Sequence, residues 1–211
     1  ITTKKGAKNQ KAQITYDGYV GFQKASNVLE LCNAKEYATM MLEGNYDAYV
    51  SHFKKSIDNY GGSYSDPDFH NWTYNTDNDW YDQMLRTALI TNHSLSIAGG
   101  SDKTTYSLGG SYLYQDGIMD VDNNYKRLNF RAAVDYNATN WLKVGFNGVF
   151  SQSEQQVPNN AAWQKAFNCP PIVALYDKNN DKAFPNKYGS PDVLGYSSNF
   201  YNPIAFAEYY D

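Results

Sequence analysis

The stretch Tyr106-Ser-Leu108-Gly-Gly110-Ser-Tyr112-Leu-Tyr114 decides the fold, and its pattern returns in Leu128-Asn-Phe130-Arg-Ala132-Ala-Val134-Asp-Tyr136 and Leu142-Lys-Val144-Gly-Phe146-Asn-Gly148-Val-Phe150. Apolar or aromatic residues recur at every second position, with glycine in some of these places. The alternate positions include serine, asparagine and charged residues, and no charge enters the apolar register of the three stretches. A period of two is typical of strands with one apolar and one polar face.

Composition narrows the class of protein. The chain has 211 residues, of which 20 are tyrosine and only 19% are charged, with a formal net charge of -4. No run approaches the roughly 20 apolar residues that a membrane helix needs, and the mean hydropathy of -0.67 excludes a helical membrane protein. The acidic balance argues against nucleic acid as a partner. Cys32 and Cys169 lie far apart and indicate neither a disulfide framework nor a metal site, although a single disulfide stays open.

The two ends of the sequence read as interior segments of a longer chain. The sequence opens with Ile1-Thr2-Thr3-Lys4-Lys5-Gly6, without an initiator Met or a signal sequence, and stops at Tyr209-Tyr210-Asp211 where a new segment begins. We therefore expect a fragment. The domains we expect are residues 1–11, which end one domain, and residues 12–211, which carry the strands.

Five strands are predicted, over residues 13–23, 92–99, 104–115, 125–136 and 141–151, with long connections over 24–91 and 152–201. Helices are expected to open at Asn33, with Glu36 completing a capping box, then over 47–57, from about residues 76–78 with Trp80, Met84 and Ala88 on one face, and over 163–167. Gly100 to Lys103 and Asn137 to Asn140 are tight turns. Residues 202–205 are expected to lead into a sixth strand.

The order of connections is long, short, medium, short, long, so all five strands fit one up-and-down sense with short turns at one end. Outer-membrane barrels have this pattern. If the first strand runs outward, the apolar register carries aromatic residues at both ends: Tyr16, Tyr106 and Tyr136 at the inner end, Phe22, Tyr114 and Phe150 at the outer end. Trp141 shares the inner level, but its register points inward and it is not counted. A soluble β-sandwich also alternates; loop parity and the aromatic residues favour the barrel.

Several stretches resemble SusC/RagA-type TonB-dependent outer-membrane transporters. Residues 1–6 look like the end of that family's plug domain, and Ile14-Thr15-Tyr16-Asp17-Gly18-Tyr19-Val20-Gly21 resembles its first barrel strand. The next hairpin and the strands after it in that family resemble five further stretches: Asp79-Trp80-Tyr81-Asp82 with Arg86, Asn92 to Gly100, Thr104 to Leu108, Tyr125 to Arg131, and Trp141 to Gly145. Residues 202–205 look like the family's approach to a sixth strand. The loops over 24–75 and 153–201 match loosely, and five strands cannot close a barrel of the 22-stranded class.

The resemblance implies an all-β fold: a fragment of a large antiparallel transmembrane β-barrel with long, partly helical extracellular loops. It implies active uptake of glycans, or of peptides, at the outer membrane of a Gram-negative bacterium. The implied partners are a SusD-like surface lipoprotein, the TonB complex through an absent N-terminal part, the oligosaccharide or peptide substrate, and outer-membrane lipid. The alternatives are a secreted β-sandwich module that binds glycans and a passive porin or adhesin barrel.

Sequence motifs give little support to an enzymatic function. The sequence Asp177-Lys178-Asn179-Asn180-Asp181 opens like a calcium loop, but Lys182 and Tyr188 replace the expected Gly and Glu, so a polar turn is the better interpretation. The three histidines have no metal-site or triad spacing, and no phosphate loop, dinucleotide or nucleophile motif is present. We expect no cofactor.

Two sets of side chains are candidate contacts. Aromatic residues in the predicted outer loops would stack on a substrate or pack under a lid: Trp72, Tyr81, Trp163 and Tyr176. For Trp80 with Met84 a small loop core is favoured instead. Charged residues of the polar register would line the lumen: Arg127, Arg131, Asp135 and Lys143.

Overall fold

The computed structural model describes residues 6–64, 72–178, 187–197 and 199–209. The chain divides into two compact units. Ile1–Lys24, Thr87–Ile118 and Asn123–Gln156 form the first, which we call the sheet unit. Ala25–Arg86, Met119–Asp122 and Val157–Asp211 form the second, which we call the loop unit.

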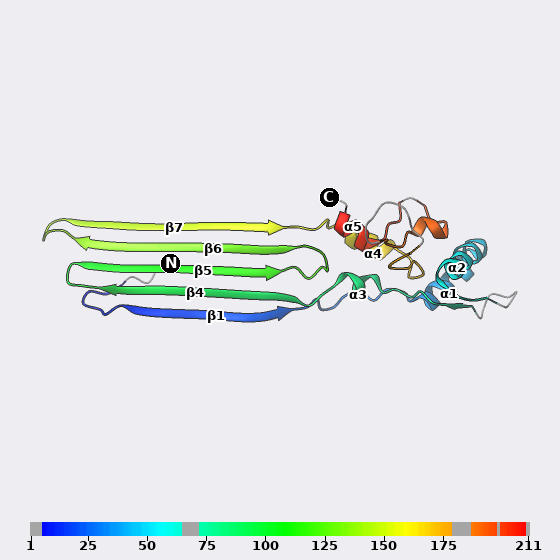
Figure 1. Ribbon diagram of the computed structural model, residues 1–211, viewed down its shortest axis with the longest axis horizontal. Helices are drawn as coiled ribbons and strands as arrows, with labels where there is room; N and C mark the ends of the chain where they lie inside the picture. The colour runs from blue at the N-terminus through cyan, green and yellow to red at the C-terminus, as the bar shows by residue number, and fades with distance from the viewer. Residues whose placement is uncertain (1–5, 65–71, 179–186, 198, 210–211) are drawn as a thin grey trace. The chain divides into compact units, whose positions relative to one another are not determined.

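The sheet unit is a five-stranded antiparallel meander (Figure 1). Its strands are β1 (Gln13–Gln23), β4 (Ala88–Gly100), β5 (Thr104–Asp116), β6 (Asn124–Asn137) and β7 (Lys143–Gln156), in the spatial order β1-β4-β5-β6-β7. All five predicted strands are confirmed, and β1 has the predicted bounds. The structure extends β4 at its start, over the mostly apolar residues 88–91, and β7 at its end, over the polar residues 152–156. The β7 strand begins at Lys143, two residues later than predicted.

Short turns join β4 to β5 and β6 to β7. The Ser101 amide donates to the Thr104 carbonyl (2.7 Å) and closes the first turn, while the Asn137 amide donates to the Lys103 carbonyl (2.8 Å) and ties the two turns together. At the opposite end of the strands, the Gly117 amide donates to the Asn123 carbonyl (3.0 Å). A Cβ at Gly117 would collide with the Asn123 side chain, so this connection requires glycine.

The loop unit contains α1 (Ala34–Gly44), α2 (Tyr46–Tyr60), α3 (Trp80–Met84), α4 (Ala162–Asn168), η1 (Pro191–Leu194) and α5 (Pro203–Tyr209), with a small sheet of β2 (Gly62–Ser63) and β3 (Thr73–Tyr74). The predicted capping box is confirmed: the Asn33 side chain accepts from the Glu36 amide, and the Glu36 carboxylate accepts from the Asn33 amide. Asp79 caps α3 by accepting from the Tyr81 and Asp82 amides.

One core joins the two long connections of the sequence. Its fully buried members come from both: Phe53, Trp80 and Met84 from the first, Ile172, Val173 and Leu194 from the second.

Polar side chains of the first connection also bond the backbone of the second. Ser56 Oγ donates to the Ile172 carbonyl (2.8 Å), and Trp80 Nε1 donates to the Pro170 carbonyl (3.1 Å). Asn78 Nδ2 donates to the Val173 carbonyl (2.6 Å). Because buried carbonyls need partners, these three bonds hold residues 170–173 of the second connection against the first connection. The loops predicted as separate regions are therefore one folded body.

Three local predictions are wrong. Ala88 begins β4 instead of continuing the third helix, because α3 ends at Met84. The segment around Asn202 leads into helix α5 and not into a strand. The Asn202 side chain accepts from the Ile204 amide (3.1 Å), and Pro203 takes the first helical position, where its missing N–H costs nothing. The predicted strand over residues 92–99 puts His93 near its outer end, whereas the structure begins β4 at Ala88 and places His93 in the middle of the strand.

Candidate functional site

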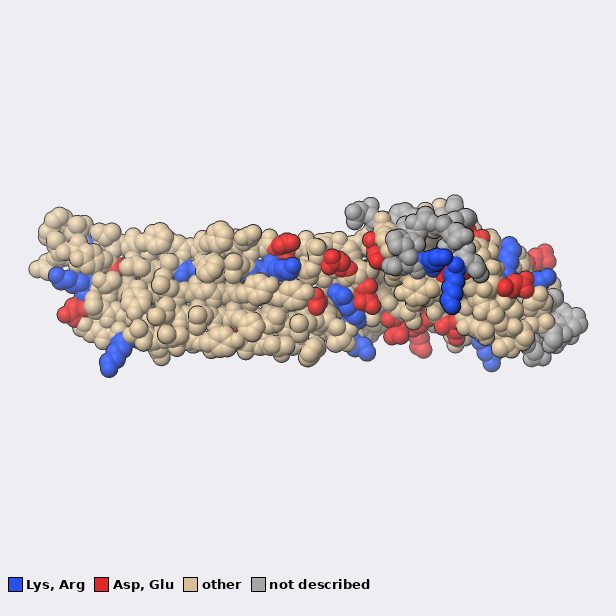
Figure 2. Space-filling model, in the orientation of Figure 1, with Lys and Arg blue, Asp and Glu red and all other residues tan. Residues whose placement is uncertain are grey.

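One face of the sheet is apolar and open to its surroundings. The register aligns Tyr16, Leu95, Gly110, Phe130 and Phe150 in one row across all five strands. Phe146, from a neighbouring row, is 64% exposed. Gly110 and Gly148 leave room between the rings, and a shallow groove of about 780 Å³ lies on this face, lined by residues that include Leu108, Phe130 and Phe146. On the side seen in Figure 2, charged side chains are sparse along the middle of the strands.

The two predicted aromatic sets run diagonally across the strands. Tyr16 on β1 and Phe150 on β7 share the row described above, and Phe22 lies six residues further along β1. The line from Phe22 to Phe150 therefore shifts by about 20 Å along the strands over about 19 Å across them, at about 3.4 Å per residue and 4.8 Å per strand. Its slope is about 45°.

The inner aromatic set slopes in the same direction. Tyr106 lies four residues before Gly110 on β5, two strands from Tyr16, and Tyr136 pairs with Thr104. The line from Tyr16 through Tyr106 to Tyr136 then has a slope of about 55°. Between the two lines the apolar face has no charged residue; Asp116, Lys126 and Glu154, which share its register, lie beyond the outer line. The aromatic lines are thus oblique to the strands and nearly parallel to each other.

A polar cluster that the sequence did not single out interrupts the apolar face. His93 Nδ1 is 2.7 Å from Tyr16 Oη, and His93 Nε2 is 2.8 Å from Thr91 Oγ1. Gly18, opposite His93, makes room for it, since a Cβ there would lie 2.6 Å from the Tyr16 hydroxyl. Both ring nitrogens are paired with hydroxyl groups, so the polar atoms of the imidazole have partners although the ring lies on an apolar surface.

The opposite face carries the polar register. Asn129 Nδ2 donates to Ser111 Oγ (3.1 Å) and Ser151 Oγ donates to Asn129 Oδ1 (2.7 Å), so one asparagine joins three strands. Two of the four predicted lumen residues meet here: Lys143 Nζ lies 3.7 Å from Asp135 Oδ2.

The other two predicted lumen residues lie apart from this ion pair. Arg131 lies opposite Gly109 on β5, and its Nη2 is buried without a hydrogen-bond partner among the described residues. Arg127 is exposed. The structure thus places all four charged candidates on one face, and a role for them toward a ligand stays a prediction.

The aromatic candidates of the loop unit occupy three places. Tyr81 on α3 and Trp163 on α4 come together, with ring centroids 5.9 Å apart. Tyr176 is 58% exposed and stacks on Tyr188 (5.3 Å). Trp72 is only 7% exposed and packs against Tyr49 and Tyr64. The predicted pairing of Trp80 with Met84 in a loop core is confirmed, since both are buried.

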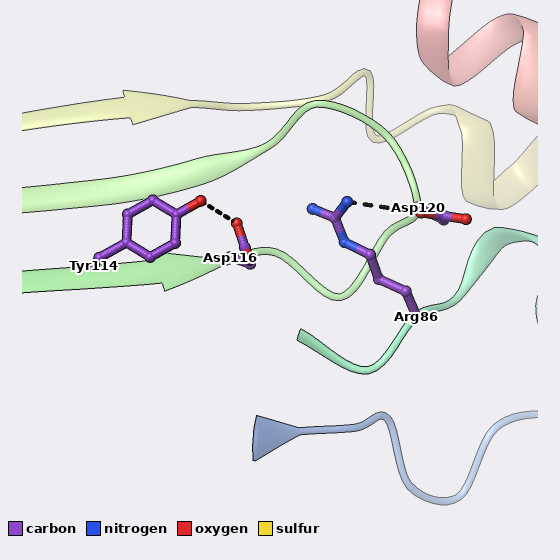
Figure 3. A network of polar contacts seen from close by, with 4 residues as sticks. All are labelled: Arg86, Tyr114, Asp116 and Asp120. Atoms are coloured by element: carbon purple, nitrogen blue, oxygen red, sulfur yellow. Dashed lines mark hydrogen bonds and ion pairs between the residues drawn. The ribbon is translucent and has the colours of Figure 1, made fainter. Parts of the chain in front are cut away.

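Polar contacts also fix the end of β5 and the end of α3 (Figure 3). In the sheet unit, the Tyr114 hydroxyl donates to Asp116 Oδ1 (2.5 Å) at the end of β5. In the loop unit, Arg86 Nη1 lies 3.6 Å from Asp120 Oδ1, and the Asp120 amide donates to the Met84 carbonyl (2.8 Å).

Burial perturbs several tyrosines of the loop unit. Desolvation raises the pKa of Tyr49 to about 12 and raises the pKa values of Tyr37, Tyr60 and Tyr196 above the usual tyrosine value. Tyr37 and Tyr196 share a hydroxyl–hydroxyl hydrogen bond (3.0 Å). The Tyr60 hydroxyl, by contrast, is buried without a hydrogen-bond partner among the described residues.

Within the described ranges, no group of three or more His, Cys, Asp or Glu side chains is arranged to hold a metal ion. Of the calcium-like sequence, Asp177 and Lys178 are described, and Asn179, Asn180 and Asp181 lie outside the described residues. No helix in the described part of the chain has the length and apolar character needed to cross a membrane.

The chain is similar in sequence to proteins named as TonB-dependent receptors. The chain is 30% identical over 208 residues to TonB-dependent receptor P3 of Formosa agariphila, which covers 98% of this chain and 18% of that protein. It is 28% identical over 192 residues to TonB-dependent receptor SusC of Bacteroides thetaiotaomicron, covering 89% of this chain and 17% of that receptor. No family model matches.

Solved structures give the same fold. A structure of the RagAB peptide transporter matches 97% of this chain and 25% of its own chain, with a TM-score of 0.66 at 18% identity. A structure of the RagAB peptide importer in the closed-closed state matches 86% of this chain and 23% of its own, with a TM-score of 0.65 at 20% identity.

The open antiparallel meander, with one apolar and one polar face, has the fold of a segment of the RagAB transporter structures. The sequence similarity to SusC and to TonB-dependent receptor P3 supports a segment of a SusC-like TonB-dependent receptor. The chain spans less than a fifth of the length of the curated relatives it matches. These relatives are receptors and importers by name, and none is named as an enzyme.

Proposed function

We propose that this chain forms part of the wall of a transmembrane β-barrel in the outer membrane of a Gram-negative bacterium. The whole protein imports glycans, or peptides, in an energy-dependent step driven by the TonB complex through another part of the polypeptide. A SusD-like lipoprotein captures the substrate at the cell surface. One fold neighbour is named as a peptide importer, which supports the peptide class, while the glycan class rests on the family resemblance of the sequence.

The observation that carries the proposal is the oblique course of the two aromatic lines on the apolar face. Strands of outer-membrane barrels tilt by about 35–45° from the membrane normal, and aromatic girdles mark the two membrane surfaces. If the aromatic lines follow those surfaces, the strands must tilt by the slope of the lines, about 45–55°. The slope of the outer line lies at the upper end of the barrel range and the slope of the inner line exceeds it by about 10°, and this shared oblique course supports lipid contact for the apolar face.

The soluble β-sandwich alternative would bury the apolar face against a second sheet. In the described part of the chain, the remaining sheet is the two-stranded pair of β2 and β3, and Phe22 and Phe146 are largely exposed. Each sheet of a sandwich needs a partner of similar size to cover such a surface, so this observation favours the barrel.

The two remaining groups of residues fit roles in transport. The polar face would line the lumen, where the Asp135–Lys143 pair and Arg131 meet water or another part of the protein. The loop unit would stand on the extracellular side, with Tyr81 and Trp163 as a paired aromatic surface for a substrate or for the lipoprotein lid. Trp72 is less suited to this role because it is buried.

Lysine substitutions in the full-length protein test the proposal. Phe146→Lys and Val134→Lys face each other on the apolar face, and each should cost roughly 2–4 kcal/mol of membrane assembly near the bilayer middle. The control is Asn147→Lys, one residue along the same strand on the polar face. We expect the first two variants to lower the folded, heat-modifiable fraction in the outer membrane and the control to leave it unchanged.

Equal tolerance of all three lysines would contradict the proposal. An uptake assay then separates active transport from a passive barrel: deletion of the TonB system should abolish uptake of the substrate by the wild-type protein. Uptake that persists without TonB would favour a passive porin.

A further inference from the structure

Trp141 is the most exposed large hydrophobic side chain in the described part of the chain, at 83%. It lies in the turn between β6 and β7. The turn is well ordered by Thr139, whose Oγ1 accepts from the Leu142 amide (2.9 Å) and from the Trp141 amide (3.3 Å). A large apolar ring held out on a hydrogen-bonded turn indicates a surface that contacts something other than water.

The register gives no direction for this ring. Counting in steps of two from Lys143 would place Trp141 on the polar face, away from the two aromatic lines. The ladder between β6 and β7 ends at the pair Asn137–Lys143, so Trp141 lies outside the strand and strand alternation does not apply to it.

The residues around Trp141 are of the types that are found at the level of lipid headgroups. Tyr136, a member of the inner aromatic line, pairs with Val144 beside the turn, and Leu142 is also exposed. Lys103, from the adjacent turn, is tied to this one by the hydrogen bond from the Asn137 amide to its carbonyl. Tryptophan and tyrosine collect at the level of lipid headgroups because their rings combine an apolar body with a polar N–H or O–H.

We propose that Trp141 inserts into the phospholipid headgroup layer at the turn end of the sheet and anchors the β6–β7 turn there. The inference rests on the proposed function, because it requires lipid at the apolar face. It adds a specific contact: the indole ring continues the inner aromatic line beyond Tyr136, with its N–H toward the ester and phosphate oxygens. The occupant is lipid, and a protein partner at this ring is the alternative outcome.

Fluorescence quenching in vesicles tests the inference with the full-length protein. The protein is reconstituted in phosphatidylcholine vesicles whose acyl chains carry bromine either near the headgroups or near the bilayer middle. The emission of Trp141 is the difference between the wild-type protein and Trp141→Phe. We expect the shallow bromine to remove a larger share of this emission than the deep bromine. The matched control is Trp163→Phe in the loop unit, whose difference emission neither lipid should quench.

A second variant separates this inference from the proposed function. Phe146→Trp, placed on the apolar face in the Trp141→Phe background, should be quenched by the deep bromine. If Phe146→Trp is quenched and the Trp141 difference emission is not, the ring meets water or protein and the inference is wrong, while the lipid-facing sheet stands. If neither emission is quenched, the proposed function fails and the inference fails with it.

Discussion

Asn78→Ala tests whether the two long connections form one body. The Asn78 side chain donates to the carbonyl of Val173, a residue with no exposed surface. Removing the amide leaves that carbonyl without this donor in the core, which costs about 1–3 kcal/mol. At the middle of this range, about 2 kcal/mol, local opening becomes roughly 30 times more frequent, since 1.4 kcal/mol is about a factor of ten.

The control for Asn78→Ala is Asn59→Ala. Asn59 Nδ2 donates to the Lys55 carbonyl at a similar distance (2.7 Å), but on the exposed side of α2. Water replaces a lost bond there, so the cost should stay within about 0.5 kcal/mol. The two variants remove the same kind of hydrogen bond and differ in burial.

The assay is pulse proteolysis of the full-length protein in detergent across a urea series. With a slope of about 2 kcal/mol per molar urea, Asn78→Ala should lower the midpoint for cleavage of the loop unit by about 1 M. Cleavage should increase together in residues 25–64 and 157–178, because one core holds both. A midpoint equal to that of Asn59→Ala, or cleavage confined to the first segment, would refute the description of the loops as one cooperative unit.

Two further predictions concern charge. Burial raises the pKa of Tyr49 to about 12 and shifts Tyr37, Tyr60 and Tyr196 in the same direction. Above pH 10 the unfolded state releases these protons before the folded state does, so the free energy of unfolding of the loop unit should fall as pH rises from about 10 to 12. It should be insensitive to these groups below pH 9; Tyr49→Phe should reduce the alkaline loss, and a urea midpoint that stays flat up to pH 11 would contradict this. Lys143→Ala removes the ion pair with Asp135 at 3.7 Å, where the lysine side chain is 61% exposed. Because exposed pairs contribute little, thermal unfolding of the sheet unit and the assembled fraction should both match the wild type, and a severe assembly defect would show that Lys143 has a partner elsewhere in the protein.

The sheet was predictable because its signal is local. Alternation in Tyr106 to Tyr114 and in its two repeats fixes both strand identity and face, and the capping box at Asn33 fixes a helix start in the same way. Strand ends were harder: the alternation weakens at Ser153 to Gln156, where the ladder continues through backbone pairing with β6.

The features that the sequence did not predict depend on contacts between residues that are far apart in the sequence. Nothing near Ile172 or Val173 in the sequence shows that Ser56 and Asn78 bond their carbonyls. Trp72 reads as an exposed loop aromatic until its packing against Tyr49 is known. The polar cluster on the apolar face depends on the pairing of β1 with β4, which brings Tyr16 to His93 over a sequence separation of 77 residues. The sequence period assigns Trp141 to the polar face only if strand alternation continues through the turn, and the ladder between β6 and β7 ends before it.

The measurement that tests the lipid-facing wall most directly is the location and electrophoretic mobility of the full-length polypeptide in its source cells. An antibody against the Tyr106–Tyr114 region would follow it through membrane fractionation and through electrophoresis with and without boiling. We expect a protein several times larger than this 23.9 kDa chain, confined to the outer membrane, whose mobility changes on heating as a folded barrel unfolds. A soluble species of 23.9 kDa that does not change on heating would contradict the barrel and favour a secreted β-sheet module.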